Sequence, residues 1–201
     1  MFITFEGLDG SGKTTQATLL VERLKADKHK VVFLREPGGT IVSEKIREIL
    51  LDKKHLDITQ TAELFLFSAA RAQLVGQVIV PSLAEGKIVV CDRFYDSTTA
   101  YQGFGRELSI EHIRHINALA TNGTTPDITL FVDVDVDEIQ RRRREAPDRM
   151  ESSGTSFYHR VREGYRTIAS EEPGRIVMID GMKPIPDIEQ EIWKIIKQRL
   201  S

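Results

Sequence analysis

The residues with the clearest chemical meaning form one octapeptide, Gly7-Leu8-Asp9-Gly10-Ser11-Gly12-Lys13-Thr14. It fits the pattern G-x-x-x-x-G-K-[ST] in full. In this pattern the glycines let the backbone curl around a polyphosphate, so that successive N–H groups point inward. The lysine reaches the β- and γ-phosphates, and the last hydroxyl ligates Mg²⁺. The sequence therefore predicts a phosphate-binding turn in which Lys13 and Thr14 have these roles.

The segments on either side of this turn are of the required kind. Phe2 to Phe5 is a short apolar run typical of a buried strand, and Thr15 to Ala26 has apolar residues at helical spacing. A helix that begins at the turn adds its positive dipole end to the phosphate site. Glycine-rich turns also occur without ligands, but the strand, turn and helix in this order favour a functional site.

Two further polar clusters follow expected strands. Asp92 and Arg93 come directly after the apolar run Ile88 to Cys91, where an acidic residue commonly helps to hold Mg²⁺ and an arginine can clamp a phosphate. The alternative is a surface turn capped by Asp92. Arg35-Glu36-Pro37-Gly38-Gly39-Thr40 forms a tight loop after the second strand. Glu36 there suits recognition of a sugar hydroxyl or orientation of an arginine, although the loop could be only a connector.

The elements that must position these clusters alternate along the chain. Strand-like runs at 31–34, 88–91, 128–132 and 176–179 are separated by segments with helical patterning. Their continuous hydrophobicity indicates a sheet covered on both faces, so we expect a three-layer α/β/α sandwich with a parallel sheet of about five strands. Ligands then belong at the carboxyl ends of the strands. The expected helices are 42–51, 61–85, 110–121, 136–144, 156–170 and 186–200.

Composition limits the remaining possibilities. The 201 residues are 40% hydrophobic, which favours a single domain over 1–201, and the arginine-rich segment at about 141–155 is expected to be a lid. A net charge of -2 gives no field for nucleic acid or an anionic membrane. The single cysteine, Cys91, fits a reducing cytoplasm, and no apolar run approaches the roughly 20 residues of a membrane span. The five histidines have no spacing that predicts a metal site. We therefore expect a soluble, cytoplasmic protein without nucleic-acid or membrane partners.

Taken together, the motifs resemble those of bacterial thymidylate kinases, and the resemblance runs from end to end. It is carried by Phe5-Glu6-Gly7 before the phosphate turn, the loop from Arg35 to Thr40, Leu66 to Gln73, Asp92-Arg93-Phe94 with Ser97 and Ala100 to Gly103, and Asp148 to Glu151 before Phe157 to Tyr165. The resemblance implies a P-loop NTPase fold and an ATP-dependent kinase of dTTP biosynthesis. The implied reaction transfers the γ-phosphoryl group of ATP to dTMP, with Mg²⁺, to give dTDP and ADP. A homodimer is also implied, and the apolar helical segments 63–83 and 110–119 could supply its interface.

The resemblance assigns roles to individual residues. The ATP-binding positions are Gly7, Leu8, Asp9, Gly10, Ser11, Gly12, Lys13, Thr14 and Arg141. The substrate-binding positions are Glu36, Arg47, Phe67, Arg71, Arg93, Thr98, Tyr101 and Gln102. The catalytic positions are Lys13, Arg93, Arg149 and Asp9, and the metal-binding positions are Thr14 and Asp92.

Helical spacing gives the base-recognition residues a physical rationale. Phe67 and Arg71 lie one helical turn apart, so the ring can stack on thymine while the guanidinium donates to a base carbonyl. Tyr101 matches the position that crowds a ribose 2′-hydroxyl in the family. By spacing alone, Phe67 would be a core residue and Arg47 a solvated helix residue.

The arginine that approaches the transferring phosphate is expected to come from the lid. Some thymidylate kinases have an arginine inside the P-loop, at the position that Gly10 occupies here. Arg149 is then the first choice, with Arg141 and Arg144 behind it. A solvated basic helix face is the alternative account of Arg141 to Arg144.

Three other functions are open to a chain with a P-loop. A P-loop kinase for another nucleoside monophosphate, or for a nucleoside, is the nearest alternative. A GTPase switch would bind GDP tightly instead of turning over ATP, but the sequence lacks N-K-x-D and has no D-x-x-G after the third strand. An interaction module with an inactive P-loop is disfavoured, because Lys13, Thr14 and Asp92 are all present.

Overall fold

The strands form one sheet in which all neighbours are parallel, in the order β2-β3-β1-β4-β5. The structure, a computed structural model, describes residues 1–142, 149 and 154–200. The strands are β1 Phe2–Glu6, β2 Val31–Arg35, β3 Ile88–Asp92, β4 Ile128–Asp133 and β5 Ile176–Asp180. Register pairs Phe5 of β1 with Asp92 of β3, so the P-loop and the Asp92 cluster leave the sheet side by side. The predicted parallel five-stranded sheet is confirmed.

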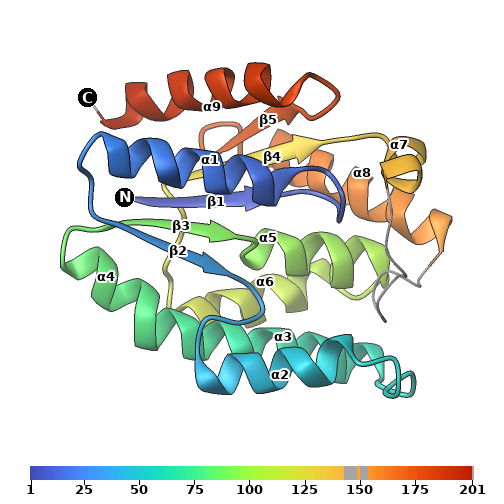
Figure 1. The fold of residues 1–201 in the computed structure, drawn as a ribbon. Coiled ribbons are helices and arrows are strands. Elements are labelled where there is room, and N and C mark those ends of the chain that lie inside the picture. The colour runs from blue at the N-terminus through green and yellow to red at the C-terminus, as the bar shows by residue number, and fades with distance from the viewer. Residues whose placement is uncertain (143–148, 150–153, 201) are drawn as a thin grey trace.

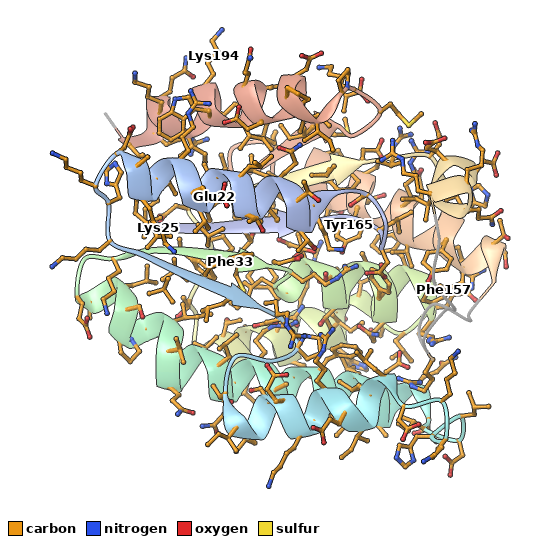
Figure 2. The ribbon with its side chains drawn as sticks, viewed as in Figure 1. Glu22, Lys25, Phe33, Phe157, Tyr165 and Lys194 are labelled. Carbon is orange, nitrogen blue, oxygen red and sulfur yellow. The ribbon has the colours of Figure 1, made fainter. Side chains whose placement is uncertain are left out.

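Helices cover both faces of the sheet (Figure 1). On one face α1 Lys13–Ala26 packs against α9 Ile185–Leu200. The other helices are α2 Ile41–Leu51, α3 Gln60–Leu74, α4 Val80–Ala84, α5 Tyr95–Thr98, α6 Ile110–Thr121, α7 Val136–Arg142 and α8 Thr155–Glu171. Charged side chains such as Glu22, Lys25 and Lys194 lie on the outer surfaces of α1 and α9 (Figure 2). The α/β/α sandwich is therefore as predicted.

The alternation of side chains along β1 divides the core. Ile3 and Phe5 belong to the cluster that contains the buried residues of α1. Phe2 belongs to a second cluster with Leu74 and Phe94. Thr4 and Glu6 share the face of Phe2 because side chains alternate along a strand. Both are fully buried: the Thr4 hydroxyl bonds the Thr129 hydroxyl of β4, and Glu6 lies beside the turn that follows β3.

One helical segment was not predicted. Residues 95–105 form α5 and a π-helical stretch, Thr99–Gly105, which packs on α8. This segment contains two glycines and β-branched threonines, which have low helix propensity. The glycines allow close approach, since a Cβ on Gly105 would lie 2.6 Å from the Phe157 ring. Tertiary packing therefore decides this helix.

The segment Gln60–Ala84 is helical throughout, with a π-helical stretch at Val75–Ile79, as the predicted range 61–85 indicated. By length and mean hydropathy it could cross a membrane, contrary to the expectation that no apolar run comes near this length. Inside this helix, however, Glu63 and Arg71 are buried and form ion pairs with other elements. Its interior face thus belongs to the core, while other apolar residues of the same helix remain exposed.

We predict that Thr40→Ala lowers the free energy of unfolding by about 1 kcal/mol, the usual cost of losing a helix N-cap. The Thr40 hydroxyl accepts a 3.0 Å hydrogen bond from the Ser43 N–H at the start of α2. Thr59 is the matched N-cap of α3, and its hydroxyl accepts an exposed 3.3 Å hydrogen bond from the Ala62 N–H. Thr59→Ala should therefore lower the free energy of unfolding by less than Thr40→Ala. Urea unfolding measures both, and an equal or reversed order would contradict the prediction.

Candidate active site

The P-loop has the backbone conformation that its glycines permit. Gly7, Gly10 and Gly12 all have positive φ, and a Cβ on Gly7 would lie 2.6 Å from the carbonyl oxygen of Val132. Only glycine therefore fits at position 7. The side chains of Lys13 and Thr14 stand at the first turn of α1, where the helix presents its unpaired N–H groups. The Lys13 ammonium lies 3.5 Å from an Asp9 carboxylate oxygen.

Thr14 and Asp92 meet between the two neighbouring strand ends. The Thr14 hydroxyl donates to Asp92 Oδ2 at 2.5 Å. Asp92 Oδ1 is buried and has no hydrogen-bond partner among the described residues. A carboxylate and a hydroxyl are hard oxygen ligands of the kind that Mg²⁺ prefers. Residues 1–142, 149 and 154–200 contain no group of three or more His, Cys, Asp or Glu that could hold a metal by themselves.

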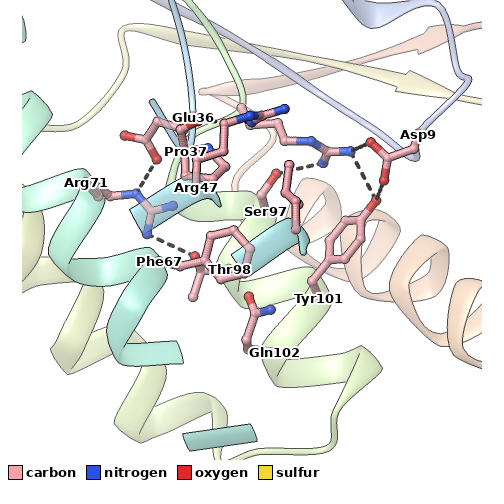
Figure 3. A pocket seen from close by; sticks show the side chains of 12 residues that line it. Asp9, Glu36, Pro37, Arg47, Phe67, Arg71, Ser97, Thr98, Tyr101 and Gln102 are labelled. Atoms are coloured by element: carbon pink, nitrogen blue, oxygen red, sulfur yellow. Dashed lines mark hydrogen bonds and ion pairs between the residues drawn. The ribbon is translucent and has the colours of Figure 1, made fainter. Parts of the chain in front are cut away.

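A pocket opens beside the P-loop and brings together residues from distant parts of the sequence (Figure 3). Its lining contains all eight residues predicted to bind substrate, namely Glu36, Arg47, Phe67, Arg71, Arg93, Thr98, Tyr101 and Gln102. Asp9, Pro37, Leu51 and Ser97 complete it. Asp9 and Tyr101 stand at one end and Glu36 and Arg71 at the other (Figure 3).

Arg71 organises one end of the pocket. It is 2% exposed, and its Nε donates to Glu36 Oε2 at 2.7 Å. Its Nη1 donates to the Thr98 hydroxyl at 2.9 Å, and its Nη2 donates to the Phe94 carbonyl at 3.1 Å. Burial raises the pKa of Glu36 to about 7, although the charge and hydrogen bond of Arg71 oppose this rise. Glu36 Oε1 is buried without a hydrogen-bond partner in the described chain, so this end holds an unused acceptor.

Arg93 organises the other end, next to the P-loop. Its Nη2 lies 2.5 Å from Asp9 Oδ1 and 3.1 Å from the Tyr101 hydroxyl. Tyr101 in turn donates to Asp9 Oδ2 at 2.9 Å. Burial alone would raise the pKa of Asp9, but the positive charges of Arg93 and Lys13 hold it below its usual range. The ionised Asp9 carboxylate therefore links two cations at the mouth of the P-loop.

The structure places Arg149, the predicted lid arginine, away from the P-loop. Its Nε donates to the Leu50 carbonyl at 2.6 Å, and its Nη1 lies 2.8 Å from Glu63 Oε2. Arg141 is exposed and pairs with Glu138 at 3.3 Å. Arg144 and most of the predicted lid, 143–148 and 150–153, lie outside the described residues. Contact between a lid arginine and phosphate thus stays a prediction.

Some residues beside the site were given no role from the sequence. Glu63 binds both Gln102 and Arg106. Glu6 and Tyr165 stand behind Arg93. A charged residue that ends an apolar strand, as Glu6 does, is the one sequence signal that could have found this group.

Comparisons with known proteins identify the relatives of this chain. A family model described as thymidylate kinase matches residues 5–192. Similar curated proteins include thymidylate kinases of Chlorobium luteolum, 48% identical over 100% of this chain and 99% of the relative, and of Caldanaerobacter subterraneus, 44% identical over 100% and 96%. A crystal structure of thymidylate kinase from Ehrlichia chaffeensis superposes with a TM-score of 0.81 at 40% identity, covering 98% of each chain.

Glu36 generates a prediction about pH. The unfolded chain releases the Glu36 proton near pH 4.5 and the folded chain near 7. Between these values the folded state binds more protons, so unfolding free energy falls as pH rises, by up to about 1.4 kcal/mol per pH unit. Glu36→Gln removes this term, so the stability of wild type relative to the variant should decline from pH 5 to 7. Urea unfolding at several pH values measures the unfolding free energy of both proteins. If the free energies of wild type and Glu36→Gln change in parallel with pH, the prediction is contradicted.

Proposed function

The chain belongs to the thymidylate kinase family, and from this premise we propose how its residues transfer the γ-phosphoryl group of ATP to dTMP. It is an ATP-dependent nucleoside monophosphate kinase whose products are dTDP and ADP, as its relatives support. Another monophosphate as the main acceptor is not favoured by these relatives. The observation that carries the assignment of roles is the pocket beside the P-loop, because it gathers all eight expected acceptor residues.

The P-loop, Gly7 to Thr14, binds the phosphates of ATP. Its N–H groups and the α1 dipole attract the phosphate oxygens, and Lys13 turns from Asp9 to the β- and γ-phosphates. The residues at the metal position fit Mg²⁺, because Asp92 Oδ1 is a buried acceptor without a partner among the described residues. Thr14 and Asp92 would hold the ion or its waters, and the bound ion supplies positive charge against the β- and γ-phosphates.

The adjoining pocket binds dTMP. Phe67 and Arg71 lie one turn apart on α3 and both line the pocket, so a thymine ring can stack on Phe67 near the Arg71 guanidinium. Thr98 and Gln102 complete the nucleoside environment, and Tyr101 restricts the space for a 2′-hydroxyl. The unused acceptor of Glu36 suits a sugar hydroxyl, and Arg47 suits the acceptor phosphate.

Arg93 acts where the two sites meet. Its pairing with Asp9 places a permanent positive charge between the P-loop and the acceptor pocket. Phosphoryl transfer needs mainly alignment and positive charge, because the transferred group carries negative charge through the transition state. Asp9 orients Arg93 and Lys13 in the absence of nucleotide, and both cations shift to phosphate oxygens when substrates bind.

We further propose that residues 1–201 act as one kinase domain with a lid at about 141–155. In this proposal Arg149 leaves Glu63 and approaches the phosphates when the lid closes, and Arg141 contacts ATP. Closure would exclude water and limit ATP hydrolysis.

A cytoplasmic location is also proposed. The free thiol of Cys91 supports this location, and the net charge of -2 supports the proposed lack of nucleic-acid and membrane partners.

A homodimer is proposed from the outer face of α3 and of the π-helical stretch Val75–Ile79 that follows it. Ala62, Phe65, Ala69, Ala72 and Gly76 are all exposed and recur every three or four residues, so they form one stripe. Small residues around one aromatic ring allow two helices to approach closely. The neighbouring helices α2 and α6 add the exposed Ile41 and Leu119, at 80% and 83% exposure. A second copy of this chain, with its own stripe, is the occupant that matches this surface.

An acceptor survey tests the kinase assignment. With ATP and Mg²⁺, ADP formation should be strong with dTMP and weak with dUMP, dCMP, UMP, AMP or no acceptor, and it should stop with EDTA. Phe67→Ala should lower kcat/KM for dTMP by about 10- to 100-fold, the value of one base–aromatic stack, and leave KM for ATP unchanged. Arg71→Ala should lower kcat/KM for dTMP by a larger factor than Phe67→Ala.

Arg114→Ala is the control for these variants, because Arg114 is exposed and pairs with Glu171 outside the acceptor pocket. It should keep wild-type kinetics. Turnover that favours another monophosphate would overturn the pocket assignment, and wild-type kcat/KM in Phe67→Ala would overturn the stacking role.

The dimer generates a separate prediction. Phe65→Glu puts a charge in the middle of the α3 stripe, so it should shift the protein from dimer to monomer in sedimentation velocity. Met178→Glu is the control, because Met178 is also exposed, at 54%, but lies on β5. An unchanged sedimentation coefficient in Phe65→Glu, or a monomeric wild type, would contradict the proposed interface.

A further inference from the structure

Glu6 is a buried carboxylate that the assigned roles leave unexplained. It ends β1, one residue before the P-loop, and is 0% exposed. Its Oε1 accepts a 2.7 Å hydrogen bond from the Phe94 N–H. Its Oε2 accepts hydrogen bonds from the Ser97 hydroxyl at 2.6 Å and the Tyr165 hydroxyl at 2.9 Å. Groups from the turn after β3, from α5 and from α8 therefore converge on one charge.

The same two hydroxyls contact Arg93 on their other side. Arg93 Nη1 donates to Ser97 Oγ at 3.0 Å and to the Tyr165 hydroxyl at 3.2 Å. Each hydroxyl has one hydrogen, so a hydroxyl that donates to Glu6 presents only lone pairs to Arg93. The two hydroxyls are also 2.9 Å apart, but neither can donate to the other while both donate to Glu6. The carboxylate therefore fixes the direction of both hydroxyl dipoles.

Glu6 also holds the backbone from which Arg93 projects. Arg93 has φ 71°, a left-handed conformation that costs a non-glycine residue free energy. The Arg93 N–H is held by the Phe5 carbonyl at 2.9 Å, and the next N–H, that of Phe94, is held by Glu6. Consecutive residues of β1 thus hold both sides of this turn.

We propose that Glu6 is a positioning residue for phosphoryl transfer, which holds the Arg93 turn and keeps the Ser97 and Tyr165 hydroxyls oriented as acceptors toward the Arg93 guanidinium. The inference rests on the proposed role of Arg93 at the phosphates. Glu6 does not touch the substrates in this scheme, because Ser97 and Tyr165 stand between it and Arg93.

The electrostatic surroundings give the arrangement a pH dependence. Burial and the neighbouring Asp96 raise the pKa of Glu6 to about 7, while Arg93 and hydrogen bonds from Ser97 and Phe94 oppose the rise. The side chains of Cys91, Tyr95 and Tyr165 also interact electrostatically with Glu6. Burial raises the pKa of each of these three groups, so they stay neutral near pH 7. A protonated Glu6 accepts fewer hydrogen bonds, which frees a hydroxyl to point its hydrogen at Arg93.

The test compares kcat of wild type and Glu6→Gln from pH 6 to 9. At pH 8 we expect the variant to have a kcat about 10- to 100-fold lower, the usual cost of a misplaced catalytic group, with KM for ATP unchanged. The ratio of the two kcat values should fall toward one at pH 6, where wild-type Glu6 is protonated. The ionisation of the substrates changes with pH equally for both enzymes, so its effect cancels in this ratio.

Asp133→Asn is the matched control. Asp133 is also a buried carboxylate at a strand end, but it pairs with Arg162 and Arg166, which hold its pKa low despite burial. The ratio of the wild-type kcat to the Asp133→Asn kcat should not change with pH. A ratio for Glu6→Gln that is constant with pH, or a wild-type kcat at pH 8, overturns the proposal.

Further variants keep the test decisive if Glu6→Gln does not fold. The pair Ser97→Ala and Tyr165→Phe removes both bridging hydroxyls but retains Glu6, so it should reproduce the loss of kcat at pH 8, and wild-type kcat in the pair overturns the proposal. Arg93→Ala separates the two proposals. Wild-type kcat in Arg93→Ala refutes the role of Arg93. If kcat falls in Arg93→Ala but the kinetics of Glu6→Gln are unchanged, only the role of Glu6 is refuted.

Discussion

The ion pair between Asp9 and Arg93 joins the two halves of the site, and the arrangement around it depends on that link. Asp9 belongs to the P-loop after β1, and Arg93 to the turn after β3. Because β1 and β3 are hydrogen-bonded neighbours in a parallel sheet, their carboxyl ends emerge together. The pair is only partly exposed, so its Coulomb attraction is screened less than that of a surface pair. Arg93 is thus held beside the P-loop, where the proposed mechanism needs a cation between the donor and acceptor phosphates.

Buried ion pairs recur in the acceptor pocket and explain its fixed shape. Arg71 and Glu36 are both nearly inaccessible, and removing one partner of such a pair typically costs about 3–5 kcal/mol because the other charge is left uncompensated. Glu63, in the first turn of α3, has a similar role, because it holds Gln102, Arg106 and Arg149. The pocket walls are therefore set before a ligand arrives, which reduces the ordering that binding would otherwise require.

The position of Arg149 has a mechanistic consequence. Its guanidinium is buried against Glu63 and the Leu50 carbonyl, so moving it to the phosphates requires breaking a buried pair. Substrate phosphates would have to replace these contacts with equally strong ones. In the proposed lid mechanism, this requirement would couple lid closure to the presence of ligand, because only phosphate would replace the contacts that Arg149 makes with Glu63 and Leu50.

The sequence by itself determined the fold class, the strands, most of the helix ranges and the eight predicted residues of the pocket lining. Apolar runs and helical spacing are local properties, and the family motifs identified the eight acceptor-pocket residues, from Glu36 to Gln102, that the structure brings into one lining. The helix at 95–105 could not be predicted, because its glycines and threonines favour other conformations until α8 packs on them. The placement of Arg149 on Glu63 was likewise beyond local patterning. Tertiary structure alone decided that Glu6, Ser97, Tyr165 and Arg93 form one hydrogen-bonded group. Hydrogen-bond direction depends on which atoms face each other across the sheet, and no local pattern of residues encodes that.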